Sequence, residues 1–250
     1  MADLKNQAVL ITGASTGIGA ATAIAMARAG ADVGINYCHS KKEAEKVRRR
    51  VEALRRRALL LEYDVCDPDQ VDAMVRAFVK KFGRLDVCFA NAGALVRRCP
   101  IVRMSDRLWH QTIAMNLDSV FYTARAALGP MLKARRGHII LNSSLAARNG
   151  GGGGAVAYAT AKGALVTFTR GLAREVAPRG IRVNAIAPGV TQTPFHEKFT
   201  SPARMKKFLA AMPLGRLGTP EDIARAVVWL AGETDGFITG ETIFVAGGDL

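Results

Sequence analysis

Short apolar runs alternate with longer amphipathic stretches along the whole chain. Within the longer stretches, apolar residues recur every three or four positions, the period of a helix with one buried face. The short runs are nearly continuous in apolar character, which is typical of strands covered on both faces. They are Ala8–Thr12, Asp32–Asn36, Ala58–Tyr63, Leu85–Ala90, His138–Asn142, Arg182–Ala187 and Thr242–Val245. This alternation predicts a doubly wound α/β fold, with a parallel sheet of about seven strands and helices on both faces.

Two helix starts can be read directly from the sequence. Asp67-Pro68 and Thr219-Pro220 each place a capping side chain before a proline at the first helical position. Asp222, which follows Thr219 by three residues, predicts a reciprocal capping box there. No linker, internal repeat or change of composition divides residues 1–250, so the pattern predicts one domain.

The composition disfavours several classes of protein. Hydrophobic residues make up 49% of the chain, but no run approaches the roughly 18 apolar residues of a membrane span. The N-terminal stretch carries Asp3 and enters a strand pattern at once, unlike a secretory signal, so we expect a cytoplasmic protein. The four cysteines form no C-x-x-C pair, which predicts reduced thiols and no metal site.

The chain is strongly basic, with 35 Lys and Arg against 21 Asp and Glu, a formal net charge of +14. The densest clusters, Lys46–Arg50 and Arg55–Arg57, belong to a helical pattern whose apolar positions are Ala44, Val47, Val51 and Leu54. These basic residues are therefore expected on a solvated outer face, and no nucleic-acid-binding motif accompanies them. The pattern disfavours a nucleic-acid partner, while positive charge also attracts anionic cofactors.

The first run leads straight into a glycine-rich turn and an alanine-rich helix. The turn is Gly13-Ala14-Ser15-Thr16-Gly17-Ile18-Gly19. Glycines allow a tight turn, the close approach of a pyrophosphate and close packing of helix on strand, while the helix N-terminus faces the phosphate charge. Glycines also mark ordinary tight turns. The position between a first strand and a first helix favours a dinucleotide site instead.

The spacing T-G-x-x-x-G-I-G and several later motifs resemble the short-chain dehydrogenase/reductase family in its single-domain form. The resemblance spans nearly the whole chain, which is similar to 3-oxoacyl-[acyl-carrier-protein] reductase-like and glucose 1-dehydrogenase-like members. It implies a Rossmann fold and a homotetramer in which the helices after Ser105 and around Tyr158 pack against a second subunit. It also implies these cofactor contacts: Gly13, Ser15, Thr16, Gly17, Ile18, Gly19, Asp64, Val65, Asn91, Ala92, Gly93, Tyr158, Lys162, Pro188, Gly189, Val190, Thr191 and Thr193.

Tyr158 and Lys162 are four residues apart and therefore share one face of a helix. Such a pair is often only a half-buried tyrosine beside a surface lysine. In the catalytic interpretation Tyr158 is a general acid whose pKa, ordinarily near 10, is lowered by the neighbouring ammonium group. The resemblance implies that Lys162 also binds the nicotinamide ribose, that Ser144 binds the substrate oxygen and that Asn116 holds a relay water.

The choice between Ser143 and Ser144 depends on spacing. The family's commonest serine-to-tyrosine interval is thirteen residues, which falls on Leu145, whereas Ser144 lies fourteen residues before Tyr158. The simplest account is one extra residue within Gly150–Gly154, and the N-S-S pattern favours Ser144. Glycine there would let the connection between a rigid strand end and a rigid helix bend close to a substrate.

The cofactor can be inferred from the end of the second run. An NAD-selective site usually has an acid there for the ribose 2′-hydroxyl, but this chain has none before Glu43. A 2′-phosphate meets no repulsion and finds donors at His39, Ser40 or Lys41, and Tyr37 is expected among the cofactor contacts. Thr16 stands where many NADP-using relatives carry a basic residue. NADP(H) is favoured, and NAD(H) stays possible.

The leading functional hypothesis is an NADP(H)-dependent carbonyl reductase or alcohol dehydrogenase acting on a small carbonyl or alcohol without a metal. The alternative enzyme is an NAD-dependent dehydrogenase of a sugar or hydroxysteroid-like alcohol. A non-catalytic dinucleotide sensor is a third hypothesis, disfavoured because Asn116, Ser144, Tyr158 and Lys162 are all present. Residues 191–213, rich in aromatic and basic side chains, are expected to form a substrate lid.

Overall fold

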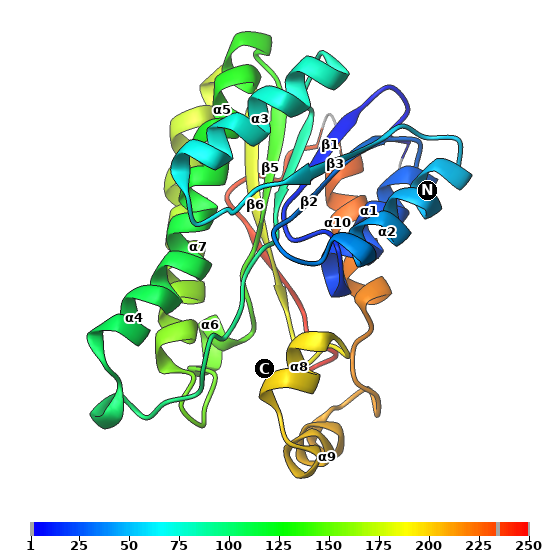
Figure 1. Ribbon diagram of the computed structural model, residues 1–250. Coiled ribbons are helices and arrows are strands. Elements are labelled where there is room, and N and C mark those ends of the chain that lie inside the picture. The colour runs from blue at the N-terminus through cyan, green and yellow to red at the C-terminus, as the bar shows by residue number, and fades with distance from the viewer. Residues whose placement is uncertain (1–2, 234–235, 250) are drawn as a thin grey trace.

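The computed structural model describes residues 3–233 and 236–249 (Figure 1). Within these residues, seven parallel strands form one sheet in the order β3-β2-β1-β4-β5-β6-β7. The predicted doubly wound Rossmann architecture is confirmed. The strands are β1 Ala8–Ile11, β2 Asp32–Tyr37, β3 Ala58–Glu62, β4 Val87–Ala90, β5 Gly137–Asn142, β6 Ile181–Pro188 and β7 Thr242–Val245.

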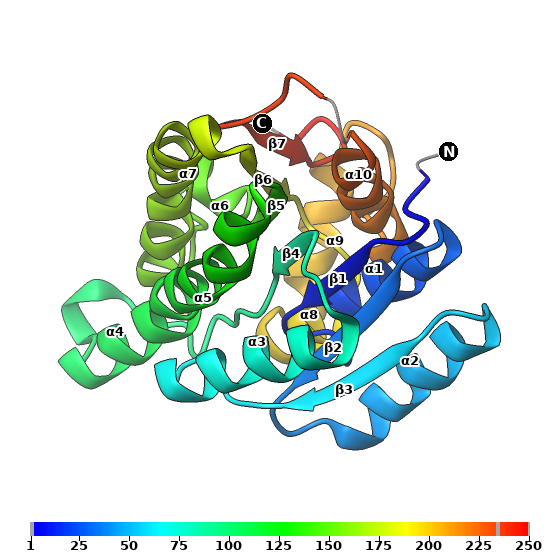
Figure 2. The ribbon, with the colours of Figure 1, turned by 90° about the horizontal axis from the view of Figure 1, so that it is seen from above.

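Helices connect the strands and form a layer on each face of the sheet (Figure 2). The α-helices are α1 Gly17–Arg28, α2 Lys41–Ala53, α3 Pro68–Phe82, α4 Asp106–Ile113, α5 Ser119–Ala134, α6 Ala146–Asn149, α7 Val156–Val176, α8 Pro194–Phe199, α9 Pro202–Ala211 and α10 Pro220–Gly232. The described ranges also contain two 3-10 turns, η1 Ile101–Arg103 and η3 Ala177–Arg179, and a π-helical segment, η2 Ala114–Asp118. None of the helices in the described ranges is long and apolar enough to cross a membrane.

Each layer buries its own hydrophobic core against the sheet. Helices α1, α2 and α10 pack on one face, where Val47 and Ile223 join side chains of the central strands. Helices α3, α5 and α7 pack on the other face, where Phe78 and Leu165 do the same. Because both faces are covered, the strands are almost entirely apolar, as the sequence predicted.

Both predicted helix caps are present. The Asp67 side chain accepts hydrogen bonds from the backbone N–H groups of Asp69 and Gln70. Thr219 and Asp222 form the reciprocal capping box at the start of α10. Since α10 packs closely on α1, this cap also fixes the helix that follows the glycine-rich turn.

Helix α2 carries the predicted basic outer face, with one correction. Ala44, Val47 and Val51 are buried, and Lys46, Arg49 and Arg50 are exposed. Leu54, expected on the buried face, lies just past the helix end and is exposed. The helix ends at Ala53, so the helical period no longer turns the next side chain toward the sheet.

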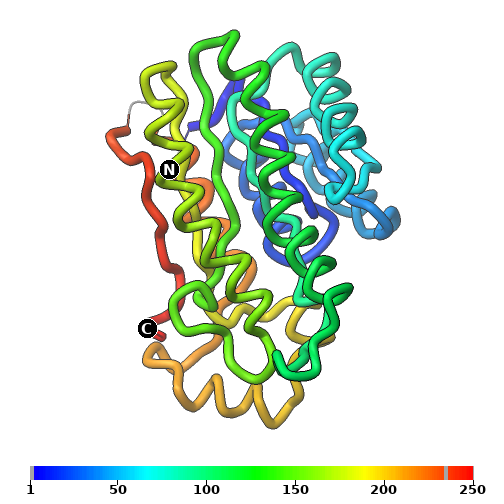
Figure 3. The backbone as a smooth tube through the Cα atoms, turned by 90° about the vertical axis from the view of Figure 1, so that its left-hand side faces the viewer, coloured from blue at the N-terminus to red at the C-terminus, as the bar shows by residue number. Residues whose placement is uncertain are grey.

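The carboxyl ends of the central strands meet at one end of the molecule, where α8 and α9 also lie (Figures 1 and 3). The strand order reverses between β1 and β4, since the chain continues from β1 outward to β2 and β3 and then returns. Connections on the two sides of this point leave in opposite directions, which opens a crevice for ligands there.

Candidate active site

A cavity of about 370 Å³ occupies this crevice. Most of the predicted site residues line it, namely those of the glycine-rich turn other than Ala14, Asn91-Ala92-Gly93, Ser144, Tyr158, Lys162, Pro188, Gly189, Val190, Thr191 and Thr193. The structure therefore brings together segments that are up to 180 residues apart in the chain, from Gly13 to Thr193. The predicted residues that do not line it are Tyr37, His39, Ser40, Lys41, Asp64, Val65 and Asn116.

The glycine-rich turn is held in place by two asparagines. Asn36 at the end of β2 accepts a hydrogen bond from the Gly13 N–H, 3.2 Å, on its side-chain oxygen. Asn91 after β4 donates its side-chain amide to the carbonyl oxygens of Thr12, 2.9 Å, and Gly13, 3.1 Å. Glycine is required at position 13, where φ is +60° and a Cβ would come within 3.0 Å of Ala92 Cα. These hydrogen bonds and the close approach to Ala92 fix the conformation of the turn.

The N-terminus of α1 suits an anion. Thr16 is the N-cap residue, yet its side chain accepts no hydrogen bond from the first turn. The first backbone N–H groups of a helix have no partner within the helix, so an uncapped N-terminus beside a cavity presents donors and a positive dipole end to a phosphate. In addition, Asn142 Oδ1 is buried and accepts no hydrogen bond in the described part of the chain. These residues fit a nicotinamide dinucleotide.

Ser143 and Ser144 follow β5 and have different environments. Ser143 is 2% exposed, and its hydroxyl donates to the Lys162 carbonyl oxygen at 2.8 Å. The Ser144 hydroxyl oxygen accepts from the Ala146 N–H at 3.1 Å and is also hydrogen-bonded with Tyr158. Ser143 therefore supports α7, whereas Ser144 stands beside the candidate acid.

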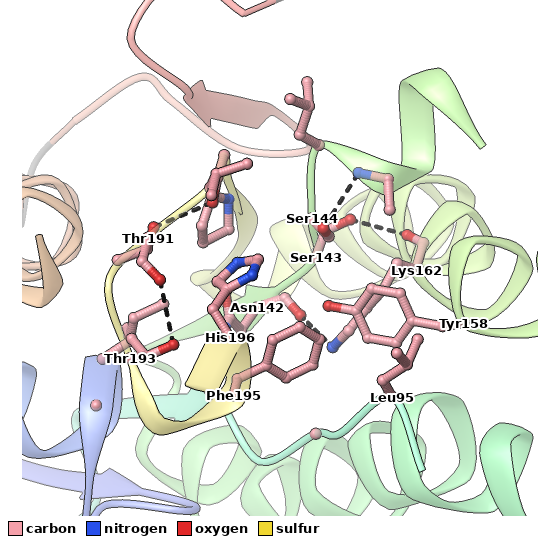
Figure 4. Close-up of a pocket in the computed structure, with 18 of the residues that line it drawn as sticks. Leu95, Asn142, Ser143, Ser144, Tyr158, Lys162, Thr191, Thr193, Phe195 and His196 are labelled. Atoms are coloured by element: carbon pink, nitrogen blue, oxygen red, sulfur yellow. Dashed lines mark hydrogen bonds between the residues drawn. The ribbon is translucent and has the colours of Figure 1, made fainter. Parts of the chain in front are cut away.

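Tyr158 and Lys162 lie on the first two turns of α7 and face the cavity together (Figure 4). The Lys162 ammonium donates to the Asn142 carbonyl oxygen at 2.7 Å and lies 5.8 Å from the centre of the Tyr158 ring. Lys162 is only 2% exposed, so the alternative of a surface lysine is wrong. The amine is buried at the junction of β5 and α7.

The direction of the Tyr158 shift differs from the sequence expectation. Burial raises the pKa of Tyr158 above its ordinary value, while the hydrogen bond with Ser144 lowers it to a smaller extent. Burial also lowers the pKa of Lys162 to about 7, so a large part of the amine is neutral at pH 7. Lys162 then exerts less of the positive charge that the expectation relied on. The raised pKa of Tyr158 favours the protonated phenol at neutral pH.

Asn116 lies on η2, a π-helical segment that interrupts the long helix expected after Ser105. Its amide nitrogen donates to the carbonyl oxygens of Ala94, 2.7 Å, and Thr112, 2.9 Å, and its oxygen accepts from the Ala94 N–H at 3.1 Å. A Cβ at Gly93 would meet both Asn116 Oδ1, at 2.9 Å, and Lys162 Nζ, at 3.1 Å. The side chains of Asn116 and Lys162 therefore both lie beside Gly93. The water that would connect them stays a prediction.

The sequence predicted no acid near the end of β2, but the structure places one there from the neighbouring strand β3. Tyr37 is buried, and its hydroxyl donates to the Glu62 carboxylate at 3.0 Å. Lys41, one of the proposed phosphate donors, lies 3.9 Å from the same carboxylate. The sequence argument considered only acids that follow β2 in the chain, whereas parallel pairing places Glu62 of β3 opposite Tyr37. Glu62 is the functional candidate that sequence reasoning missed here.

The segment 191–213 contains α8 and α9 and borders the cavity. The Phe195 ring lies 5.8 Å from that of Tyr158. A hydrogen bond of 3.0 Å joins His196 Nδ1 and Thr200 Oγ1. Burial, with a smaller contribution from the charge of Arg98, lowers the pKa of His196 to about 4. Both side chains lie across the cavity from Lys162 in Figure 4. Other lining residues that sequence reasoning did not single out include Leu95, Arg98, Asn149 and Asp249.

The glycine run 150–154 has an unusual backbone. All five residues have positive φ, between +51° and +77°. A Cβ at Gly154 would come within 2.9 Å of the Cys99 backbone nitrogen, which donates a hydrogen bond to the Gly154 carbonyl oxygen. The glycines therefore permit both the conformation and the close approach of neighbouring chain, which agrees with the expectation that they bend the connection.

Comparison with known proteins assigns the family. A family model described as enoyl-(acyl carrier protein) reductase matches residues 13–249. A 3-oxoacyl-[acyl-carrier-protein] reductase, FabG, of Thermotoga maritima is 37% identical over 245 residues, which cover 98% of each chain. The chain belongs to the short-chain dehydrogenase/reductase family. It is accordingly an oxidoreductase with a Rossmann fold, the fold that binds nicotinamide dinucleotides.

Two solved structures of short-chain dehydrogenases/reductases superpose closely on the chain. A 7α-hydroxysteroid dehydrogenase complexed with NADH and 7-oxo glycochenodeoxycholic acid has a TM-score of 0.93 at 29% identity and covers 98% of this chain and 95% of its own. A short-chain dehydrogenase from Burkholderia cenocepacia in complex with NADP has a TM-score of 0.89 at 33% identity, with 98% of each chain covered. Members with this architecture thus bind either nicotinamide.

Proposed function

We propose that this oxidoreductase uses NADP(H) to reduce a carbonyl group to a secondary alcohol, with Tyr158 as the proton donor. The observation that carries the proposal is the convergence of Ser144, Tyr158 and Lys162 at the wall of the cavity that the glycine-rich turn also lines. The name of the Thermotoga maritima relative makes a 3-oxoacyl group the first substrate class to test. Assembly as a homotetramer is part of the proposal.

The side chains divide the work as follows. A bound nicotinamide supplies the hydride. The Ser144 hydroxyl donates a hydrogen bond to the carbonyl oxygen, on which negative charge develops. Tyr158 transfers its phenolic proton to that oxygen. Its raised pKa keeps it protonated at neutral pH, which is the form that reduction requires. Lys162 fixes the end of β5 through Asn142 and stabilises the phenolate when its amine is protonated.

One observation favours the NAD-dependent alternative. The Glu62 carboxylate lies beside Tyr37 and Lys41, where a 2′-phosphate is expected to bind. An acid repels that phosphate and can accept a hydrogen bond from a 2′-hydroxyl. However, Glu62 and Lys41 are largely exposed, so their attraction is weak and solvent screens the carboxylate. NADP(H) therefore remains the proposal.

A substrate panel tests both parts of the proposal. 3-Oxoacyl thioesters, ketones, aldehydes and sugars are assayed with NADPH and NADH at fixed ionic strength, and kcat/KM is compared. We expect carbonyl reduction with NADPH favoured by about tenfold or more, and a further rise in this preference in Glu62→Gln. Glu52→Gln, which removes a carboxylate that pairs with Arg48 on α2, is the control. A preference for NADH in the wild type would contradict the cofactor assignment.

A further inference from the structure

Arg98 joins the two walls of the substrate cavity. Its Nε donates to the Phe199 carbonyl oxygen at the end of α8, 2.8 Å, and its Nη1 donates to the carbonyl oxygens of Gly152 and Gly153, each at 3.2 Å. Three bonds fix the plane of the guanidinium group. In the described part of the chain, its second terminal nitrogen, Nη2, has no hydrogen-bond partner, and Arg98 lines the cavity.

A second guanidinium group lies against the same two glycines. A Cβ at Gly153 would collide with the Arg204 guanidinium, and one at Gly152 would lie 3.4 Å from Arg204 Nη2. Arg204 belongs to α9, where its guanidinium also packs 5.5 Å from the centre of the Phe208 ring. Because Gly152 and Gly153 have no side chains, both guanidinium groups can lie against this pair of residues.

No acid balances these two charges within residues 3–233 and 236–249. Neither Arg98 nor Arg204 has a carboxylate within ion-pair distance there, whereas other arginines, such as Arg48 and Arg216, do. Burial, and to a smaller extent the charge of Arg204, lowers the pKa of Arg98. Asp249 also lines the cavity but pairs with neither group. Two partly buried cations therefore lie together uncompensated, which is unfavourable until an anion joins them.

We propose that Arg98 and Arg204 bind an anionic group, a carboxylate or a phosphate, on the carbonyl substrate. The inference rests on the proposed reductase function and adds a second point of recognition to Ser144 and Tyr158. The anion accepts charge-assisted hydrogen bonds from Arg98 Nη2 and from Arg204. It also holds α9 against the glycine run, because Arg98 lies on the segment after β4 and lines the cavity, whereas Arg204 lies on α9.

Matched substrate pairs test the proposal. One arm compares oxo acids of increasing length with their methyl esters. The other compares a 3-oxobutanoyl pantetheine thioester with its 4′-phosphorylated form, so the arms distinguish carboxylate from phosphate. Wild type is compared with Arg98→Gln and Arg204→Gln. Arg97→Gln is the control, since Arg97 is exposed, makes no side-chain hydrogen bond in the described ranges and carries the same charge.

We expect wild type to prefer the anionic member of at least one pair by about tenfold or more in kcat/KM. The ratio of kcat/KM for the anionic to the neutral member should fall toward one in Arg204→Gln and Arg98→Gln. It should persist in Arg97→Gln and decrease at high salt. Equal kcat/KM within every pair, or a preference that survives both substitutions, overturns the subsite and leaves the reductase function intact.

A binding measurement separates the subsite from the reaction. If no carbonyl compound is reduced, the proposed function fails. Calorimetric dissociation constants of the oxo acids and their esters, with saturating NADP⁺, then decide the subsite alone. Tighter binding of the acids that is lost in Arg204→Gln supports it, and equal binding of acid and ester refutes it.

Discussion

At the scale of single residues, burial determines what each polar group near the cavity can do. Ser143 and Ser144 are neighbours of the same type, yet only Ser143 is buried with its hydroxyl committed to the backbone of α7. Tyr158 and Lys162 both shift toward their neutral forms because water is removed from them. The cavity therefore holds a protonated phenol and an amine that titrates near neutrality, a pair suited to proton transfer at physiological pH.

The two serines should respond differently to removal of the hydroxyl. Ser144→Ala should lower kcat by about 100-fold or more, because the donor to the developing oxyanion is lost. Ser143→Ala should keep most of its turnover and lose about 1 kcal/mol of unfolding free energy, since its buried bond to Lys162 disappears. Steady-state kinetics and urea unfolding of both variants check this. A larger loss of kcat in Ser143→Ala would reverse the assignment.

Lys162 should make stability depend on pH. Its pKa is about 7 in the folded chain and ordinarily 10.5, so above pH 7 the unfolded state binds the extra proton. Stability should then rise with pH relative to Lys162→Met, by at most about 1.4 kcal/mol per pH unit, and the difference should be flat below pH 7. Urea unfolding of both proteins from pH 6 to 9 measures it. A constant difference over this range would mean that the amine keeps its ordinary pKa.

At the scale of elements, the strands and caps could be predicted well from the sequence. Near-continuous apolar runs and the Thr219-Pro220 start depend on local patterns, and the structure has them within about two residues. Contacts between neighbouring elements could not be predicted. Glu62 lies beside Tyr37 because of strand pairing. Arg97 and Arg98 are identical in type, and only tertiary packing makes Arg98 bind the Phe199 carbonyl oxygen while Arg97 stays exposed. The π-helical segment that contains Asn116 also has no local sequence pattern that predicts it.

The glycine run offers a test of why its backbone must be free of side chains. Gly154→Ala and Gly150→Ala both place alanine at positive φ, +77° and +74°. Only at position 154 does the new Cβ meet backbone, 2.9 Å from the Cys99 nitrogen, whereas position 150 is open. Gly154→Ala should therefore raise the KM of the carbonyl substrate several-fold more than Gly150→Ala, with similar cofactor affinity. Equal KM values would show that the approach to Cys99 does not shape the cavity.

At the scale of the whole molecule, several large apolar side chains are left on the surface of the single chain. Phe121 on α5 and Val156 at the start of α7 are 41% and 44% exposed. These are the helices expected to pack against a second subunit. In the proposed homotetramer, packing of these helices against a second subunit would cover both side chains.

Assembly should therefore be measurable in solution. Light scattering at micromolar concentrations should give about four times the 26.7 kDa chain mass, and Phe121→Glu should lower it by placing a charge in the interface. The control is Trp229→Glu, which changes an exposed side chain on α10. A monomeric mass for the wild type would refute the homotetramer.

The central claim is that Tyr158 supplies the proton in carbonyl reduction, and Tyr158→Phe tests it most directly. The substitution keeps the ring against Phe195 and removes only the hydroxyl beside Ser144. Single-turnover oxidation of bound NADPH by a carbonyl substrate, with the NADPH dissociation constant measured in parallel, is the decisive measurement. We predict a fall in rate of about 100-fold to 10,000-fold with a nearly unchanged dissociation constant. A rate within a few-fold of wild type would contradict the role of Tyr158 as the acid.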